Sequence, residues 1–168
     1  MRKGIAIDIG EKCGVCVFET SGPNHAKVLE YGVARKMGGK GRYIMIDETL
    51  DNMWKAWDGL IARVKPDLVI AEEGFGNRVK VVNAQARMRG FIWAAAMSHD
   101  TKFMTINVAE WRRAVKDAFG VTFPANTDRV KALSLQLVRD NFGIDNVEDH
   151  VSDAVLIAQA ATRLGYIS

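Results

Sequence analysis

Near the start of the chain, residues 4–10 form an apolar stretch in which Asp8 is the only charged residue. The stretch is rich in isoleucine, a β-branched residue, and such runs are typical of strands buried on both faces of a sheet. Burying a lone carboxylate is costly unless an arginine, a set of hydrogen-bond donors or a metal ion compensates its charge. The stretch therefore predicts a fold with a central sheet. Asp8 is then either a site residue or a solvated carboxylate at a strand end.

The 168 residues correspond to one domain, which we expect to span residues 1–168. With 48% hydrophobic and 26% charged residues, the composition is that of a globular protein and not of a disordered chain. No apolar run approaches the ~20 residues of a membrane span, and the chain enters a strand without a signal peptide. We therefore expect a cytoplasmic protein without membrane contact. Its net charge of +3 permits nucleic-acid binding without requiring it.

Cys13 and Cys16 form a C-x-x-C motif, which occurs in redox sites and in zinc sites. A zinc site of this kind needs further ligands, and the sequence has no second cysteine pair. Residues three apart on a strand also point to opposite faces of the sheet. A packing role is therefore favoured over a metal or redox role.

Apolar patterns predict four further strands, at residues 13–19, 27–33, 67–71 and 102–106. Helical spacing predicts helices at residues 43–64, 78–98, 109–118, 128–141 and 148–163. Short connections favour antiparallel pairing of the first three strands, whereas helices lead into the later strands and favour parallel pairing. The expected fold is α/β, with a mixed central sheet of about five strands, the first three antiparallel, flanked by helices. Residues 37–42 are expected to form a basic loop.

A second acidic position follows a second buried strand, because Glu72 and Glu73 come directly after residues 67–71. Open α/β sheets bind ligands at the carboxyl ends of their parallel strands, so Asp8 and one of these glutamates are expected to converge. Adjacent strand residues point in opposite directions, and only one glutamate can therefore face Asp8. Spacing alone does not say which one.

The last predicted helix carries His150 and Asp153, which are three residues apart and share one face. The favourable electrostatics of acids at a helix N-terminus account for Glu148 and Asp149. Asp153 lies past the first turn and beside the apolar stripe, where an unpaired charge is costly. His150 and Asp153 are therefore further candidates for a site.

Together, Asp8, Glu72, His150 and Asp153 supply three carboxylates and an imidazole, and mutual repulsion would raise the carboxyl pKa values unless cations lie among them. Oxygen ligands suit Mg²⁺ or Mn²⁺, and Mn²⁺ tolerates an imidazole better. The set is large enough for two ions about 3.5–4 Å apart, an arrangement that activates water and stabilises the leaving oxygen in phosphodiester hydrolysis. Nearby basic residues would hold the backbone phosphates.

The order of these parts resembles the RNase H-like nuclease superfamily and, within it, the RuvC-type Holliday-junction resolvases. The resemblance covers nearly the whole chain and rests on an ordered set of segments, at residues 7–10, 70–75, 85–87, 90, 115–116 and 150–154. It implies an RNase H-like fold and a metal-dependent endodeoxyribonuclease that resolves four-way DNA junctions in recombination and repair. Residues 108–124 depart from the bacterial housekeeping pattern, which is compatible with a bacteriophage-encoded member.

The resemblance also implies the metal site. Asp8, Glu72, His150 and Asp153 match the metal ligands of the family, in which some members have Asp at the position of His150. This match selects Glu72 over Glu73. The implied cofactor is two Mg²⁺ ions per active site, with Mn²⁺ as a substitute.

Contacts to branched DNA are implied in the same way. Phe75 matches an aromatic residue that stacks on unpaired bases, and a core phenylalanine is the alternative. Lys116, expected to assist catalysis, and one of Arg129 and Lys131 match lysines near the scissile phosphate. The whole expected set of DNA contacts is Phe75, Arg78, Lys80, Arg87, Arg113, Lys116, Arg129 and Lys131. The helix at residues 78–98 matches the dimer helix, and a homodimer suits a four-way junction because paired nicks need two equivalent sites.

Three other functions remain open. A RuvC-like nuclease of broader specificity would also cut flaps and forks, and the altered segment at residues 108–124 makes this compatible with the sequence. A sugar-kinase or actin-like phosphate-binding fold would need a second Asp-x-Gly turn and about twice this length. A DNA-binding module without catalysis would have no reason to retain uncompensated carboxylates.

Overall fold

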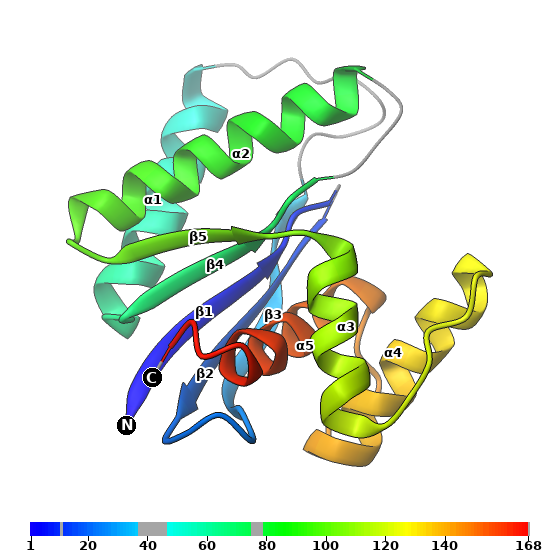
Figure 1. Cartoon of the computed structure of the whole chain (residues 1–168). Helices are drawn as coiled ribbons and strands as arrows, with labels where there is room; N and C mark the ends of the chain where they lie inside the picture. Colours follow the sequence, from blue (N-terminus) through cyan, green and yellow to red (C-terminus); the bar gives the residue numbers. More distant parts are fainter. Residues whose placement is uncertain (11, 37–46, 75–78, 168) are drawn as a thin grey trace.

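The computed structural model describes residues 1–10, 12–36, 47–74 and 79–167. The predicted loop at residues 37–42, Phe75 and Arg78 lie outside the described residues. In chain order the elements are β1 (Arg2–Asp8), β2 (Lys12–Thr20), β3 (Lys27–Lys36), α1 (Asp47–Val64), β4 (Leu68–Glu72), α2 (Val79–Ser98), β5 (Lys102–Ile106), α3 (Val108–Phe119), α4 (Thr127–Phe142) and α5 (Asp149–Arg163) (Figure 1). None of the described helices combines the length and the apolar character needed to cross a membrane.

The described strands form one sheet in the order β3-β2-β1-β4-β5. β1 pairs antiparallel with β2, and β2 with β3, whereas β1 and β4, and β4 and β5, pair in parallel. This confirms the predicted mixed sheet in which the first three strands are antiparallel. α1 and α2 carry the chain back to the end of the sheet at which β1 begins. β4 and β5 can therefore run in the same direction as β1, as parallel pairing requires.

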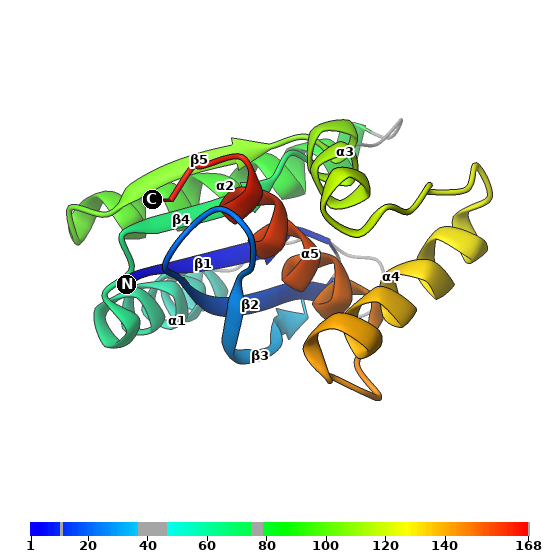
Figure 2. The same cartoon turned by 60° about the horizontal axis from the view of Figure 1, so that its bottom comes forward.

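Helices cover both faces of this sheet (Figures 1 and 2). α1 and α2 pack together over one face, in a core that includes Ile5 and Ile7. α5 covers the other face, in a core that includes Ala6, and α3 and α4 pack against α5. Ile5, Ala6 and Ile7 are all fully buried, so β1 is covered on both faces, as its unbroken apolar sequence predicts.

α5 lies close against β1 and β2, and its buried residues include several alanines, among them Ala154 and Ala158. Gly14 on β2 allows the closest approach, since a Cβ at this position would lie 1.9 Å from the carbonyl oxygen of His150. A larger residue would push the first turn of α5 away from the sheet. Gly14 thereby helps to hold His150 beside the end of β1.

Cys13 and Cys16 are both free and buried. Cys13 belongs to the core under α1 and α2, and Cys16 to the core under α5. The two thiols therefore face opposite sides of the sheet, as the period of a strand predicts. Burial raises the pKa of Cys13 to about 12, which is typical of an unreactive structural cysteine.

Candidate active site

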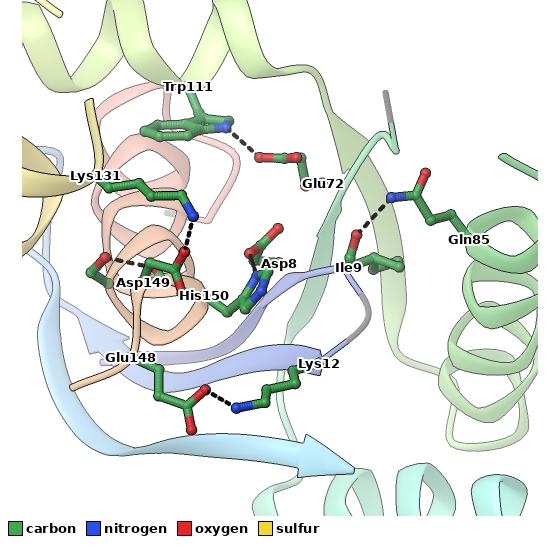
Figure 3. A network of polar contacts seen from close by, with 11 residues as sticks. Asp8, Ile9, Lys12, Glu72, Gln85, Trp111, Lys131, Glu148, Asp149 and His150 are labelled. Atoms are coloured by element: carbon green, nitrogen blue, oxygen red, sulfur yellow. Dashed lines mark hydrogen bonds and ion pairs between the residues drawn. The ribbon is translucent and has the colours of Figure 1, made fainter. Parts of the chain in front are cut away.

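Asp8 and His150 are in contact where the end of β1 meets the start of α5 (Figure 3). His150 Nδ1 lies 2.7 Å from Asp8 Oδ2, and Asp8 is only 7% exposed. Gly10 leaves room for the imidazole, because a Cβ there would lie 2.8 Å from His150 Cε1. The hydrogen bond that the imidazole donates to Asp8 and the charge of this carboxylate raise the pKa of His150, although partial burial acts in the opposite direction.

Glu72, the last residue of β4, lies in the same region. Its Oε2 accepts a hydrogen bond from Trp111 Nε1 on α3, over 2.8 Å. Burial raises the pKa of Glu72 to about 8, and the negative charge of Asp8 adds to this rise. Glu73 instead accepts a hydrogen bond from the Thr105 hydroxyl, over 2.9 Å, and is exposed. The glutamate that shares the region of Asp8 is therefore Glu72.

Asp153 follows His150 by almost one turn of α5. Like that of Glu72, its carboxyl pKa is raised. Burial raises its pKa to about 6, and the charge of Asp8 contributes to the rise. The nearby Ser134 hydroxyl and the Arg112 guanidinium favour the ionised form and act in the opposite direction. Asp8 thus acts on both other carboxyl groups, which places all three acids in one region at the carboxyl end of β1 and β4.

These carboxylates are poorly compensated. Within the described part of the chain, neither Glu72 nor Asp153 forms an ion pair, and the partner of Asp8 is the His150 imidazole. Carboxyl groups that are buried beside one another without a cation are held partly in the neutral form, as the raised pKa values of Glu72 and Asp153 indicate. Such a group of perturbed acids is typical of a functional site.

The donor set suits a hard divalent cation, because carboxylate oxygens are the ligands that Mg²⁺ prefers and one imidazole is accepted by Mn²⁺. Among the described residues, no three His, Cys, Asp or Glu side chains converge on one point closely enough to hold an ion. Glu72 is turned toward Trp111, and His150 Nδ1 is occupied by Asp8. The residues therefore have the ligand types of a metal site and lie in one region. Rotation of the Glu72 and His150 side chains would be needed to bring the ligands together.

The predicted DNA contacts are placed in several ways. Lys131 Nζ lies 2.7 Å from Asp149 Oδ2, so this cation is paired at the start of α5 (Figure 3). Arg113 lies near Tyr166, whose hydroxyl donates to Glu110. Three more of the set, Arg87, Lys116 and Arg129, are exposed and make no ion pair within the described chain. Lys80 lies in α2, but its side chain is outside the described part.

Three residues of this region were not among the predicted site residues. Trp111 is fully buried and donates to Glu72. Its neighbour Arg112 acts electrostatically on both Glu72 and Asp153. A buried tryptophan needs an acceptor for its N–H, which is the one sequence signal that could have connected α3 with an acid.

The third residue is Gln85 on α2, which lies in one of the segments that carry the family resemblance. Its Nε2 donates to the carbonyl oxygen of Ile9 over 3.1 Å. Gly74 packs against the same side chain, since a Cβ there would lie 2.1 Å from Gln85 Oε1. Gln85 therefore joins the chain segments that follow β1 and β4, immediately after Asp8 and Glu72.

No protein-family model matches the sequence, and no curated protein matches it. Solved structures do match. The chain is similar to Thermus thermophilus RuvC in complex with a Holliday-junction substrate, with 17% identity and a TM-score of 0.73, over 98% of this chain and 97% of that chain. A second Thermus thermophilus RuvC structure matches with 20% identity and a TM-score of 0.71, over 97% and 96% of the two chains.

The match extends to a eukaryotic protein. The yeast mitochondrial Holliday-junction resolvase Ydc2 has 11% identity and a TM-score of 0.66, over 95% of this chain and 77% of that chain. At such low identity the likeness concerns the fold, and it covers nearly every residue of the chain. The protein therefore has the RuvC-type form of the RNase H-like fold, as the order of its sequence segments predicts.

Proposed function

We propose that residues 1–168 form a single nuclease domain that resolves four-way DNA junctions by metal-dependent hydrolysis of phosphodiester bonds. The observation that carries this proposal is a group of three poorly compensated carboxylates near the carboxyl ends of β1 and β4, of which Asp8 is buried and Glu72 and Asp153 are half-buried. The same fold, in Thermus thermophilus RuvC, is known bound to a Holliday-junction substrate, which supports branched DNA as the partner.

In this proposal Asp8, Glu72, His150 and Asp153 hold two Mg²⁺ ions, for which Mn²⁺ can substitute. Bound ions of this kind supply an activated water and stabilise the leaving oxygen. The chain's own residues prepare the site: Trp111 fixes one oxygen of Glu72, and the His150 ring holds Asp8 in place. Burial raises the pKa of Glu72 to about 8, so a cation held by these residues would favour loss of the Glu72 proton at neutral pH.

The reaction is the hydrolysis of one phosphodiester bond on each of two strands. A bond forms between the water oxygen and phosphorus, a bond between phosphorus and one sugar oxygen breaks, and the departing oxygen takes up a proton. Two symmetric cuts require two equivalent sites, and we propose a homodimer formed through the helix at residues 78–98. Trp93 and Met97, one turn apart on α2, are 52% and 56% exposed, which supports this helix as an interface.

The test is a nicking assay on a four-way junction, a flap, a fork and a linear duplex, with and without Mg²⁺. We expect paired nicks in the four-way junction that require the metal, and little cleavage of the duplex. Equal cleavage of flaps and forks would replace the proposal by a nuclease of broad branched-DNA specificity. Binding without any cleavage would make the protein a DNA-binding module.

A further inference from the structure

Arg112 follows Trp111 on α3 and is held between aromatic rings. Its Cζ lies 5.2 Å from the centroid of the Trp111 ring and 5.4 Å from that of Phe123. The two rings meet edge to face, with centroids 5.7 Å apart and an angle of 88°. Contacts of this kind attract a guanidinium and restrict the directions in which it can point.

One hydrogen-bond donor of this guanidinium has no partner in the described structure. Its Nε is buried and has no hydrogen-bond partner, and Arg112 forms no ion pair with any described residue. A buried N–H without a partner costs about 1–3 kcal/mol, and buried polar groups in proteins are almost always satisfied. The unpaired N–H on this restricted guanidinium therefore indicates that a ligand supplies the missing acceptor.

The position of Arg112 relative to the acids identifies the kind of ligand. Arg112 lies over the Trp111 ring, whose Nε1 donates to Glu72 Oε2 over 2.8 Å, so the guanidinium is close to the Glu72 carboxyl. Its positive charge also acts on Asp153. The aromatic contacts hold the guanidinium there without an ion pair to either acid. The guanidinium presents several N–H donors in one plane beside the carboxylates. This arrangement suits an anionic ligand, because the negative charge of the carboxylates would otherwise repel it.

We propose that the Arg112 guanidinium binds the non-bridging oxygens of the scissile phosphate. This inference rests on the proposed nuclease function. It differs from the contacts predicted from the sequence, among which Lys131 is paired with Asp149, and Arg113 lies near Tyr166. Arg112 offers an unpaired N–H and makes no ion pair with a described residue, and its planar fork can contact two phosphate oxygens at once, which a lysine cannot do.

The test compares wild type, Arg112→Gln and the control Arg139→Gln, an exposed arginine on α4 that pairs with Asp140, in single-turnover cleavage of a four-way junction. Junction affinity is measured separately in EDTA. Loss of one such donor typically lowers the rate about 10²-fold or more, so we expect that loss for Arg112→Gln with junction affinity changed less than about threefold. Arg139→Gln should cleave like wild type.

A phosphorothioate at the scissile position gives a readout that a purely structural role would not change. We expect sulfur at one non-bridging position to slow the wild type, and this slowing to shrink in Arg112→Gln because the contact is already lost. Thermal unfolding shows whether the variant is folded. If it is not, Arg112→Lys replaces it, with an expected rate loss of about tenfold and the same reduced sensitivity to sulfur.

Two results would overturn the assignment: wild-type cleavage by Arg112→Gln or Arg112→Lys, or an unchanged sensitivity of the folded variant to sulfur. Failure of the wild type to cleave any branched DNA is a different result. It would remove the proposed function itself and not the placement of Arg112 alone.

Discussion

Acidic residues at the two ends of the parallel strands differ in how their charge is compensated. At the amino end of β4, Asp67 is exposed, and its carboxylate binds Arg2 and the backbone N–H of Lys3, each over 2.9 Å. These contacts lower the pKa of Asp67. At the carboxyl end, Glu72 and Asp153 are largely buried without an ion pair in the described chain, and their pKa values are raised to about 8 and about 6.

The difference separates a carboxylate that the folded chain compensates from carboxylates that it does not compensate. Asp67 is satisfied by the folded chain itself, so its ionisation stabilises the fold. Glu72 and Asp153 are not satisfied, and their ionisation opposes folding unless an external cation arrives. The carboxyl end of the sheet is therefore where we propose that a cation binds, and open α/β sheets bind their ligands at this end.

The largest expected difference between the two ends concerns catalysis. Asp8→Asn should lower metal-dependent junction cleavage by about 10³-fold or more, because the stabilisation lost with a metal ligand is several kcal/mol. Asp67→Asn at the other end should leave the rate unchanged. Both variants should bind the junction nearly as wild type does. Cleavage by Asp8→Asn at the wild-type rate would show that the metal site is assigned wrongly.

Backbone packing at the two regions can be compared in the same way. Gly14→Ala places a Cβ against the carbonyl oxygen of His150, and overpacking of this kind lowers the free energy of unfolding by about 1–3 kcal/mol. It should also slow cleavage by displacing His150. Gly32→Ala on β3, where a Cβ meets nothing within 4 Å, is the control and should be nearly neutral. Chemical denaturation of both variants measures the difference, and equal stabilities would contradict the close packing of α5 on β2.

The electrostatic contrast predicts that neutral substitutions of Glu72 and Asp67 change the free energy of unfolding in opposite directions. Because the folded-state pKa of Glu72 is raised from 4.5 to about 8, its ionisation destabilises the metal-free protein progressively as the pH rises through this range. Glu72→Gln keeps an acceptor for Trp111 and should raise the free energy of unfolding at pH 8 by about 1–3 kcal/mol.

Asp67→Asn is the matched control at the opposite end. Its lowered pKa means that its ionised form adds stability above the ordinary value of 3.8, and that this stability is lost as the pH falls through the folded-state pKa. The variant should therefore be slightly less stable than wild type at pH 8. Denaturant unfolding at pH 5 and pH 8 measures both variants, and a destabilised Glu72→Gln at pH 8 would contradict the contrast.

The smallest expected effect concerns metal preference. His150→Asp replaces an imidazole by a carboxylate and should retain cleavage while shifting the preference from Mn²⁺ toward Mg²⁺ several-fold. His99 follows α2, pairs with Asp58 and lies near Asp67 at the opposite end of the sheet, so the control His99→Asp should leave this ratio unchanged. Rates measured with each ion give the comparison. An unchanged ratio in His150→Asp would remove His150 from the metal ligands.

The sequence was sufficient to predict the sheet and to predict that Asp8 and Glu72 lie in one region of it. Asp8 and Glu72 could be placed together because each ends a buried strand, and parallel strands bring such ends to one edge. Asp153 stood out because it interrupts the apolar side of a helix. The choice of Glu72 over Glu73 needed the resemblance, since alternation along a strand does not say which face holds the site.

Arg112 could not be predicted because its role depends on how α3 is oriented against β4 and α5. Along the sequence it is one of several basic residues, and Arg113 beside it looks equally suitable. Only tertiary packing, which buries Trp111 beside Glu72, places Arg112 against the Trp111 and Phe123 rings and Arg113 near Tyr166. Interactions between distant segments of this kind leave little periodic signal in a sequence.

Calorimetric titration of the metal-free protein with Mn²⁺ and Mg²⁺ at pH 7, in two buffers of different ionisation enthalpy, tests the central claim most directly. If the acids at the carboxyl end await a cation, binding will be saturable and will release about one proton per chain, drawn from the Glu72 carboxyl. This proton release will be absent in Glu72→Gln. Absence of binding, or proton release that is the same in Glu72→Gln, would contradict the account.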